Sequence, residues 1–372
     1  MDQVFRSKQS LIPAQILAAF CLFLMVGCVI SPRRTLGGGG GTPTPTPSPT
    51  ATPTPNPAAT GKLYVSNSGA ASIVRFDNAF TANGDVSPAA TISGANTTLN
   101  SPSFMTLDAA ADRLYVANTG DLSVVIFDGV STKSGTVNIA PTRTIAGVAT
   151  GLLQPTDVAL DKSRDMLYVA DDIDIFVFNS ASSAATTGNV PFSRDISPGF
   201  TVSAIFLDST NNRLFVADQA ADAIAIFDNA STLNGPVKAT RVVQGAATHL
   251  AVPSGVTVDG VGRLIVSNVG NGTTIPPTIT IYANAAIADG NIPPVAEITG
   301  SSTGLVTPDQ IVVDKTGTGT LYNADPGAAR IAIFGNLNTA NANIAPTRSI
   351  NGPSTGLTVG SQPVGVALDT TR

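Results

Sequence analysis

The residues most able to do chemistry in this sequence are carboxylates gathered in one short segment. Asp171, Asp172 and Asp174 form the stretch DDID directly after an apolar run. Ca²⁺ takes six to eight oxygen ligands, so three carboxylates within four residues are a candidate start for a calcium site. An Asx side chain at such a position can also cap a tight turn without any metal. Both interpretations stay open at this stage.

Acidic or amide residues recur at the position of Asp171 along the chain. They end the segments LYVSN, LYVAN, LFVAD, LIVSN and LYNAD, at Asn67, Asn118, Asp218, Asn268 and Asp325. Candidate ligand-binding residues are therefore Asn118, Asp171, Asp172, Asp218 and Asp325. Recurrence in every copy favours turn capping, because a single ligand site has little need of six copies. The additional acids Asp172 and Asp174 are what sustain the metal hypothesis.

Composition disfavours most enzyme classes. The chain has one histidine, His249, one glutamate, Glu297, and no tryptophan. Catalytic metal sites need several histidine or carboxylate ligands that converge on one point. His249 stands in the loop QGAATHLAVPSG, and no nucleophile-elbow motif accompanies it. We therefore assign no catalytic residue and no required cofactor, and keep Ca²⁺ as the one possible ion.

Charge and cysteine content argue against nucleic-acid binding and against disulfide bonds in the mature domain. The formal net charge is −5, and the sequence holds no basic stripe that would displace counterions from a nucleic acid. Cys21 and Cys28 are the only cysteines, and both precede the repeats described below. The mature domain therefore has no disulfide and must be stabilised by packing.

The elements that position these residues come in six copies, about fifty residues apart, which marks a repeat architecture. In the copy between Pro102 and Gly147, four short apolar runs (FMTLD, RLYVA, SVVIFD and TRTIA) are separated by turn residues. Such runs predict four β-strands. Four strands per unit predict an all-β fold, a six-bladed β-propeller.

The ends of the repeat region predict how the ring closes. Residues 61–372 open on a second strand, LYVSN, and stop after a lone first strand, PVGVALD. We expect this last strand to join the first three, because closure removes an open sheet edge. Arg143, Arg194, Arg241 and Arg348 recur in the fourth strands, and we expect them to be exposed and to protect sheet edges.

The order VALD, LYVAD, IFVFN resembles NHL-repeat and YVTN-type six-bladed propellers, over roughly Gly61 to Asp369. The resemblance implies that the VALD strand lines the central channel and that the TRTIAG strand lies outermost. It also implies that the loops after LYVAD open on the face where such propellers bind ligands. The family hosts many activities, so it implies little about function.

The sequence before the propeller predicts export and lipid anchoring. A charged start, an apolar run and Leu24–Cys28 (LMVGC) resemble a bacterial lipoprotein signal, with residues 1–27 removed and Cys28 acylated. An uncleaved membrane anchor is the alternative, since the apolar span is near twenty residues. Residues 28–60, rich in Gly, Pro and Thr, predict a stalk without a core. Val29 stands where an inner-membrane retention aspartate would, which by resemblance favours the outer membrane.

These features favour a non-catalytic binding scaffold held at the cell envelope. We expect it to be a monomer that binds an envelope or extracellular protein, peptide or glycan, and to contact the membrane only through its lipid. One alternative is a cation-dependent, lactonase-like hydrolase or lyase. Another is a structural component of a surface layer. The scarcity of histidine and glutamate favours a binder over an enzyme, whereas nothing in the sequence separates a binder from a structural protein.

Overall fold

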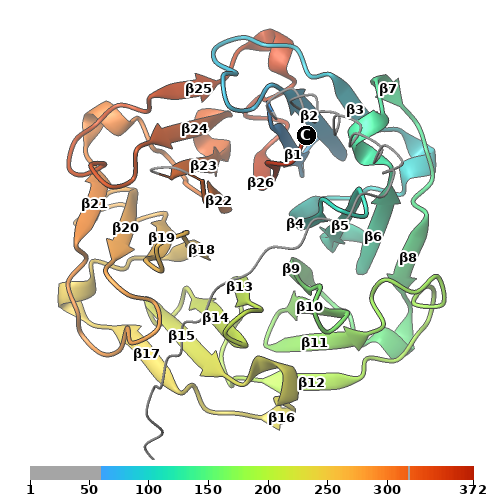
Figure 1. Cartoon of the computed structure of the whole chain (residues 1–372), viewed down its shortest axis with the longest axis horizontal. Coiled ribbons are helices and arrows are strands. Elements are labelled where there is room, and N and C mark those ends of the chain that lie inside the picture. The colour runs from blue at the N-terminus through green and yellow to red at the C-terminus, as the bar shows by residue number, and fades with distance from the viewer. Residues whose placement is uncertain (1–59, 317–318) are drawn as a thin grey trace, which may run out of the picture. The chain divides into compact units, whose positions relative to one another are not determined.

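A computed structural model describes residues 60–316 and 319–372 and shows a ring of six β-sheets (Figure 1). The predicted signal peptide, Cys28 and the stalk up to residue 59 lie outside the described residues. The helical elements of the described part are short 3₁₀ turns, and none of them is long and apolar enough to cross a membrane. The predicted six-bladed β-propeller is therefore confirmed.

Each blade consists of four antiparallel strands, ordered from the channel outward. Blade 1 contains β26 (Pro363–Asp369), β1 (Lys62–Asn67), β2 (Ser72–Asp77) and β3 (Ala90–Ser93). Blade 2 contains β4 (Pro102–Asp108), β5 (Arg113–Asn118), β6 (Ser123–Asp128) and β8 (Arg143–Ala146). Blade 3 contains β9 (Pro155–Asp161), β10 (Met166–Asp171), β11 (Asp174–Asn179) and β12 (Arg194–Ser197).

The second half of the chain repeats this arrangement. Blade 4 contains β13 (Ala204–Asp208), β14 (Arg213–Asp218), β15 (Ala223–Asp228) and β17 (Arg241–Gln244). Blade 5 contains β18 (Pro253–Val258), β19 (Leu264–Asn268), β20 (Thr278–Tyr282) and β21 (Ala296–Thr299). Blade 6 contains β22 (Ile311–Asp314), β23 (Thr320–Asp325), β24 (Arg330–Gly335) and β25 (Arg348–Ile350). The VALD strand is innermost and the TRTIAG strand outermost, as the resemblance implied.

The ring closes in blade 1, as the ends of the repeat region predicted. β26 pairs with β1 along its length, with Leu63 opposite Leu368 and Val65 opposite Val366. The amide of Gly61 also donates a 2.8 Å hydrogen bond to the carbonyl of Arg372. The last strand of the chain is therefore the inner strand of the first blade.

The core lies between neighbouring blades, because each sheet buries both of its faces. Tyr115 of β5, for example, packs among residues of blades 2 and 3, and its hydroxyl donates to the carbonyl of Ala181 at 3.3 Å. All five tyrosines of the chain are at most 1% exposed. Burying a large side chain of this kind stabilises the fold by about 1.5–3 kcal/mol.

The outermost strands are covered by the following blade. The short strand β7 (Gly135–Val137), in the connection between the third and fourth strands of blade 2, pairs in parallel with β3. β16 (Gly235–Pro236) likewise pairs in parallel with β12. In the other four blades the outermost strand forms a single parallel bridge with the following blade, at Ile145–Gly188, Val243–Gly290, Ile298–Ala342 and Gly84–Ile350. The sheet edges are thus paired within the molecule, which removes the usual site of strand-to-strand association.

The recurring arginines of the outer strands do not protect exposed edges, and that expectation was wrong. Arg143 is 6% exposed, and its Nη1 donates to the carbonyls of Ala181 and Ser183 at 2.8 Å. Arg194, Arg241 and Arg348 likewise donate to backbone carbonyls of the next blade. These side chains lock one blade to the next, because they satisfy carbonyls that a tight turn leaves without partners.

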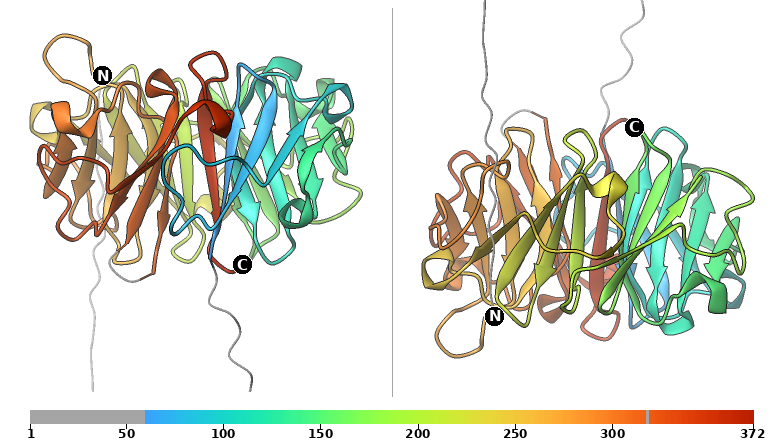
Figure 2. Two further views of the ribbon diagram at one scale, coloured as in Figure 1. Left: turned by 90° about the horizontal axis from the view of Figure 1, so that it is seen from above. Right: turned by 90° about the horizontal axis from the view of Figure 1, so that it is seen from below.

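Two faces of the ring follow from the strand directions. We call the side where Gly61 meets Arg372 the entry face; it also carries the turns from each first strand to its second (Figure 2). The opposite, distal face carries the turns from second to third strands, at 67–72, 118–123, 171–174, 218–223, 268–278 and 325–330. The loops that lead from one blade to the next also lie there.

Candidate binding face

The predicted Asx residues all lie on the distal face, at the ends of the second strands. Both carboxylate oxygens of Asp171 accept backbone hydrogen bonds, from the amides of Leu153 at 2.7 Å and Gln154 at 2.8 Å. Asn118 accepts from the amide of Asn100 at 2.7 Å. These side chains therefore fasten the loop that arrives from the preceding blade, which is a wider span than the capping of their own turns.

Asp325 and Asp218 complete the set. Asp325 accepts from the amide of Thr307 at 2.9 Å and pairs with Arg330 at 3.4 Å. Asp218 caps its own turn, since it accepts from the amide of Ala221 at 3.0 Å. Both carboxylates are buried and are engaged by neighbouring groups of the fold, and a role for them in ligand binding stays a prediction.

Asp172 and Asp174 are arranged differently from Asp171. Asp172 is exposed in the turn, with a positive φ of 47°, and Asp174 is half-buried at the start of β11. Among the residues that the structure describes, no group of three or more His, Cys, Asp or Glu side chains is placed to hold a metal ion. Burial raises the pKa of Asp171, and the charges of Asp172 and Asp174 raise it further. The calcium site remains a prediction.

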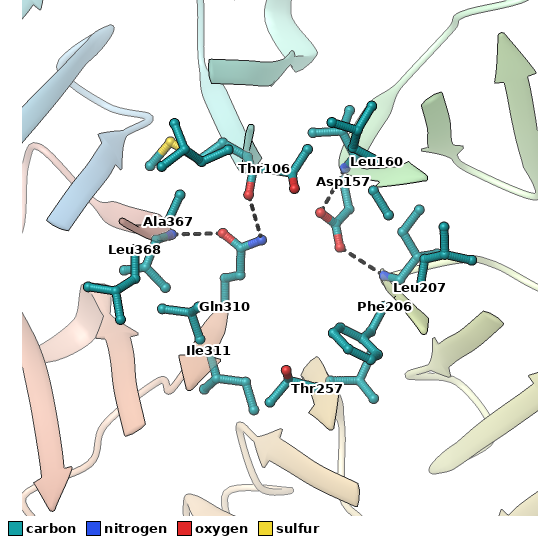
Figure 3. Close-up of a pocket in the computed structure, with 18 residues that line it drawn as sticks. Thr106, Asp157, Leu160, Phe206, Leu207, Thr257, Gln310, Ile311, Ala367 and Leu368 are labelled. Atoms are coloured by element: carbon teal, nitrogen blue, oxygen red, sulfur yellow. Dashed lines mark hydrogen bonds between the residues drawn. The ribbon is translucent and has the colours of Figure 1, made fainter. Parts of the chain in front are cut away.

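A central channel of about 210 Å³ is the one cavity lined by the inner strands of all six blades (Figure 3), within the part of the chain described. Asp157 of β9 is the titratable side chain in its wall. Its Oδ1 accepts from the amide of Val158 at 2.7 Å, and its Oδ2 from the amide of Ile205 in blade 4 at 2.8 Å. Burial raises the pKa of Asp157 to about 8 despite these two donors.

Gln310 provides a second link across the channel. Its Oε1 accepts from the amide of Val366 in blade 1 at 2.7 Å, and its Nε2 donates to the carbonyl of Met105 in blade 2 at 3.4 Å (Figure 3). Inner strands have a neighbour on one side only, so alternate backbone groups point into the channel and need partners. Asp157 and Gln310 satisfy several of them, and these polar atoms therefore join blades.

Sequence reasoning missed Asp157 and Gln310. A signal for them exists, since aligning the inner strands places both at one position, where the other blades have Phe104, Ala204, Gly255 and Gly365. Only two blades carry a side chain able to reach the next blade's amide. The single histidine, His249, is half-exposed and contacts Glu297 at 3.1 Å on the outer strand of blade 5.

Charge is distributed unequally between the two faces. Among the lysines and arginines of the described residues, Arg330 alone stands in a distal turn or loop. The distal turns and loops carry the carboxylates Asp121, Asp171, Asp172, Asp174, Asp218, Asp222, Asp309 and Asp325. Burial raises the pKa of Asp309 well above its usual range, with further contributions from Asp157 and Asp325. Burial thus favours the neutral form of Asp309, whereas the exposed carboxylates Asp121, Asp172 and Asp222 stand on a face with few cations.

Comparison with known proteins shows the fold of this chain, but neither its family nor its function. The sequence matches no known family profile and none of the curated proteins. Among solved structures, a chain in "Crystal structure of Nidogen/Laminin Complex" is similar, with a TM-score of 0.55 and 14% sequence identity. The match covers 83% of this chain and 98% of that one. At this identity the likeness supports the β-propeller architecture alone.

Proposed function

We propose that this protein is an envelope-anchored, non-catalytic propeller of the NHL-repeat type that binds a protein, peptide or glycan through its distal face. The observation that carries the proposal is the placement of the chain's entry. Residue 60 joins the ring at the entry face, beside Arg372. A tether ahead of residue 60 would attach there and leave the distal face free.

The channel favours binding over catalysis. The polar side-chain atoms of Asp157 and Gln310 in its wall are engaged by the backbone of neighbouring blades. A general acid or base must have a reachable proton or lone pair beside its substrate. Asp157 is 2% exposed, and both of its carboxylate oxygens accept hydrogen bonds from backbone amides. It is therefore better placed to join two blades than to exchange a proton with a substrate.

The proposed anchor is Cys28, acylated after removal of residues 1–27, at the bacterial outer membrane. Cys28→Ser should release the protein from membranes or leave an unprocessed precursor. Fractionation followed by mass measurement of the mature N-terminus tests this. A Ser variant that stays with membranes at normal mature size would contradict it.

The binding face can be tested by site-specific photo-crosslinking in intact cells. A photoreactive amino acid at Leu153 or Val359 would sample the distal face, where these side chains are 73% and 66% exposed. The matched control is Val261, which is 70% exposed in an entry-face turn. We expect discrete crosslinked species from the distal positions only. Crosslinks from Val261 alone would overturn the assignment of the face.

A further inference from the structure

One part of the distal face combines exposed apolar side chains with carboxylates that have no cation. It spans the turn 119–122 of blade 2, the loop 148–154 and the turn 171–174 of blade 3, which we call the blade 2–3 patch. The hydroxyl of Thr119 donates to the carbonyl of Pro155 at 2.6 Å, and the amide of Leu153 donates to Asp171. These contacts place the loop between the two turns.

The apolar side chains of the patch are open to solvent. Leu122 is 45% exposed, Val148 95%, Leu153 73% and Ile173 53%. Single exposed apolar residues are ordinary on protein surfaces, but several on adjoining segments with a polar rim mark an interaction surface. The backbone beneath is fixed, because Asp171 holds the amides of Leu153 and Gln154. The part of the loop that carries Leu153 is therefore fastened to blade 3.

The rim of the patch is acidic. Asp172 and Asp174 belong to the turn of blade 3, and Asp121, in the turn of blade 2, accepts a hydrogen bond from Asn100 Nδ2 at 2.8 Å. The ion pairs found among the described residues include none of the three acids. The crowding of Asp172 and Asp174 against Asp171 is an unfavourable like-charge interaction, which contributes to the raised pKa of Asp171. A cationic group placed here would turn that repulsion into attraction.

We propose that the blade 2–3 patch docks a basic, amphipathic peptide segment of a partner protein, with its apolar side chains on Leu153 and Ile173 and its lysines or arginines at Asp121, Asp172 and Asp174. This inference rests on the proposed binding function and names the partner class. Charge complementarity selects a cationic partner, and the apolar side chains select one with hydrophobic residues beside its charges. A glycan fits less well, because no tryptophan exists and every tyrosine is buried, so the patch offers no such ring for a sugar to stack on.

The test is a fluorescence-polarisation titration of the whole mature protein with a labelled twelve-residue peptide of leucines and lysines. A second peptide replaces the lysines by glutamates. Asp172→Asn with Asp174→Asn removes two charges from the patch, and Leu153→Ser with Ile173→Ser removes its apolar centre. Asp222→Asn with Asp289→Asn is the charge-matched control outside the patch, and Val306→Ser with Val359→Ser is the apolar control on the same face.

We expect the lysine peptide to bind, the glutamate peptide not to bind, and each patch variant to weaken binding by about fivefold to tenfold. The control variants should change binding less than about twofold. If the charge-matched control weakens binding equally, the peptide responds only to the net charge of the protein, and the assignment of the binding site to the patch is wrong. Displacement of the peptide by CaCl₂, together with a calcium-dependent rise in melting temperature, would assign the acids to a cation instead.

Failure of this inference is separable from failure of the proposed function. If the peptide does not bind while crosslinking from Leu153 still captures a partner, the partner is not basic and the patch proposal is wrong. The distal face would then remain the binding face. If crosslinks arise only from Val261, both proposals fail together.

Discussion

The two faces of the propeller use their charges in opposite ways. On the entry face and the adjoining outer strands, several lysines and arginines form ion pairs or hydrogen bonds within the fold. Examples are Arg113 with Asp128, Arg263 with Asp259 at 2.7 Å, and Arg143 with carbonyls of the next blade. The distal face carries Asp121, Asp172 and Asp174 without a cation.

This difference separates the polar groups that stabilise the ring from the polar groups that are available to bind a partner. Groups that are buried and saturated with hydrogen bonds contribute to stability and have little capacity left for ligands. Exposed carboxylates that crowd one another are slightly unfavourable in the isolated protein and favourable beside a cation. We therefore expect changes to the buried, hydrogen-bonded groups to destabilise the protein, whereas changes to the exposed distal acids should leave it folded or stabilise it.

Removal of the closing strand should have the largest effect. Deleting Pro363–Arg372 takes away β26, exposes the apolar edge of β1 and opens the channel. We expect insolubility, or a melting temperature lowered far beyond that of any point variant. Deleting only Thr370–Arg372 keeps β26 whole and should cost much less. A strand-deleted protein that melts like the full chain would contradict the closure.

Removing one arginine that joins two neighbouring blades should lower the free energy of unfolding by a smaller but measurable amount. Arg143→Ala leaves the carbonyls of Ala181 and Ser183 without their donor, and we expect a loss of about 3 kcal/mol in the free energy of unfolding. Lys162→Ala is the control, because this 58% exposed side chain forms a surface ion pair worth under about 1 kcal/mol. Urea denaturation measures both. Similar losses for the two variants would show that Arg143 is not a lock.

The buried carboxyl group of Asp157 in the channel wall should make the free energy of unfolding depend on pH. The pKa of Asp157 is about 8 in the folded protein and 3.8 as the ordinary value, so the fold favours the protonated acid. This contribution is complete below about pH 4 and is lost as the pH rises toward 8. Relative to Asp157→Asn, the wild type should lose about 2 kcal/mol between pH 5 and pH 7. Parallel stability curves for the two proteins would refute this.

The smallest effect, of opposite sign, is expected on the distal face. Asp172→Asn with Asp174→Asn relieves repulsion around Asp171 and should raise the free energy of unfolding by about 0.5 kcal/mol in chelator. Thermal melts in calcium and in chelator separate this from a metal site. A calcium-dependent stabilisation of the wild type that vanishes in the variant would restore the calcium prediction. A destabilised variant in chelator would show that these acids are needed by the fold.

Much of the fold could be predicted from the sequence, because each repeat carries its own strand and turn signals. LYVAD and its variants predicted the second strands, and the lone PVGVALD predicted the closing strand that β26 provides. Asp171 was singled out correctly as a residue of the distal turns, but its partners were not. They are the amides of Leu153 and Gln154, in the loop that arrives from the preceding blade.

The sequence alone determined the number of blades, the four strands of each blade and the scarcity of catalytic residue types, since these depend on local pattern and composition, whereas the order of the strands from the channel outward was implied by the family resemblance. Only the tertiary structure decided that Arg143 is a lock, that Asp157 and Gln310 join blades across the channel, and that uncompensated acids gather on the face opposite residue 60. The reason is physical. Whether a charge meets a carbonyl, a carboxylate or water often depends on residues of another blade, such as Ala181 for Arg143 and Ile205 for Asp157, and only the closed ring brings them together.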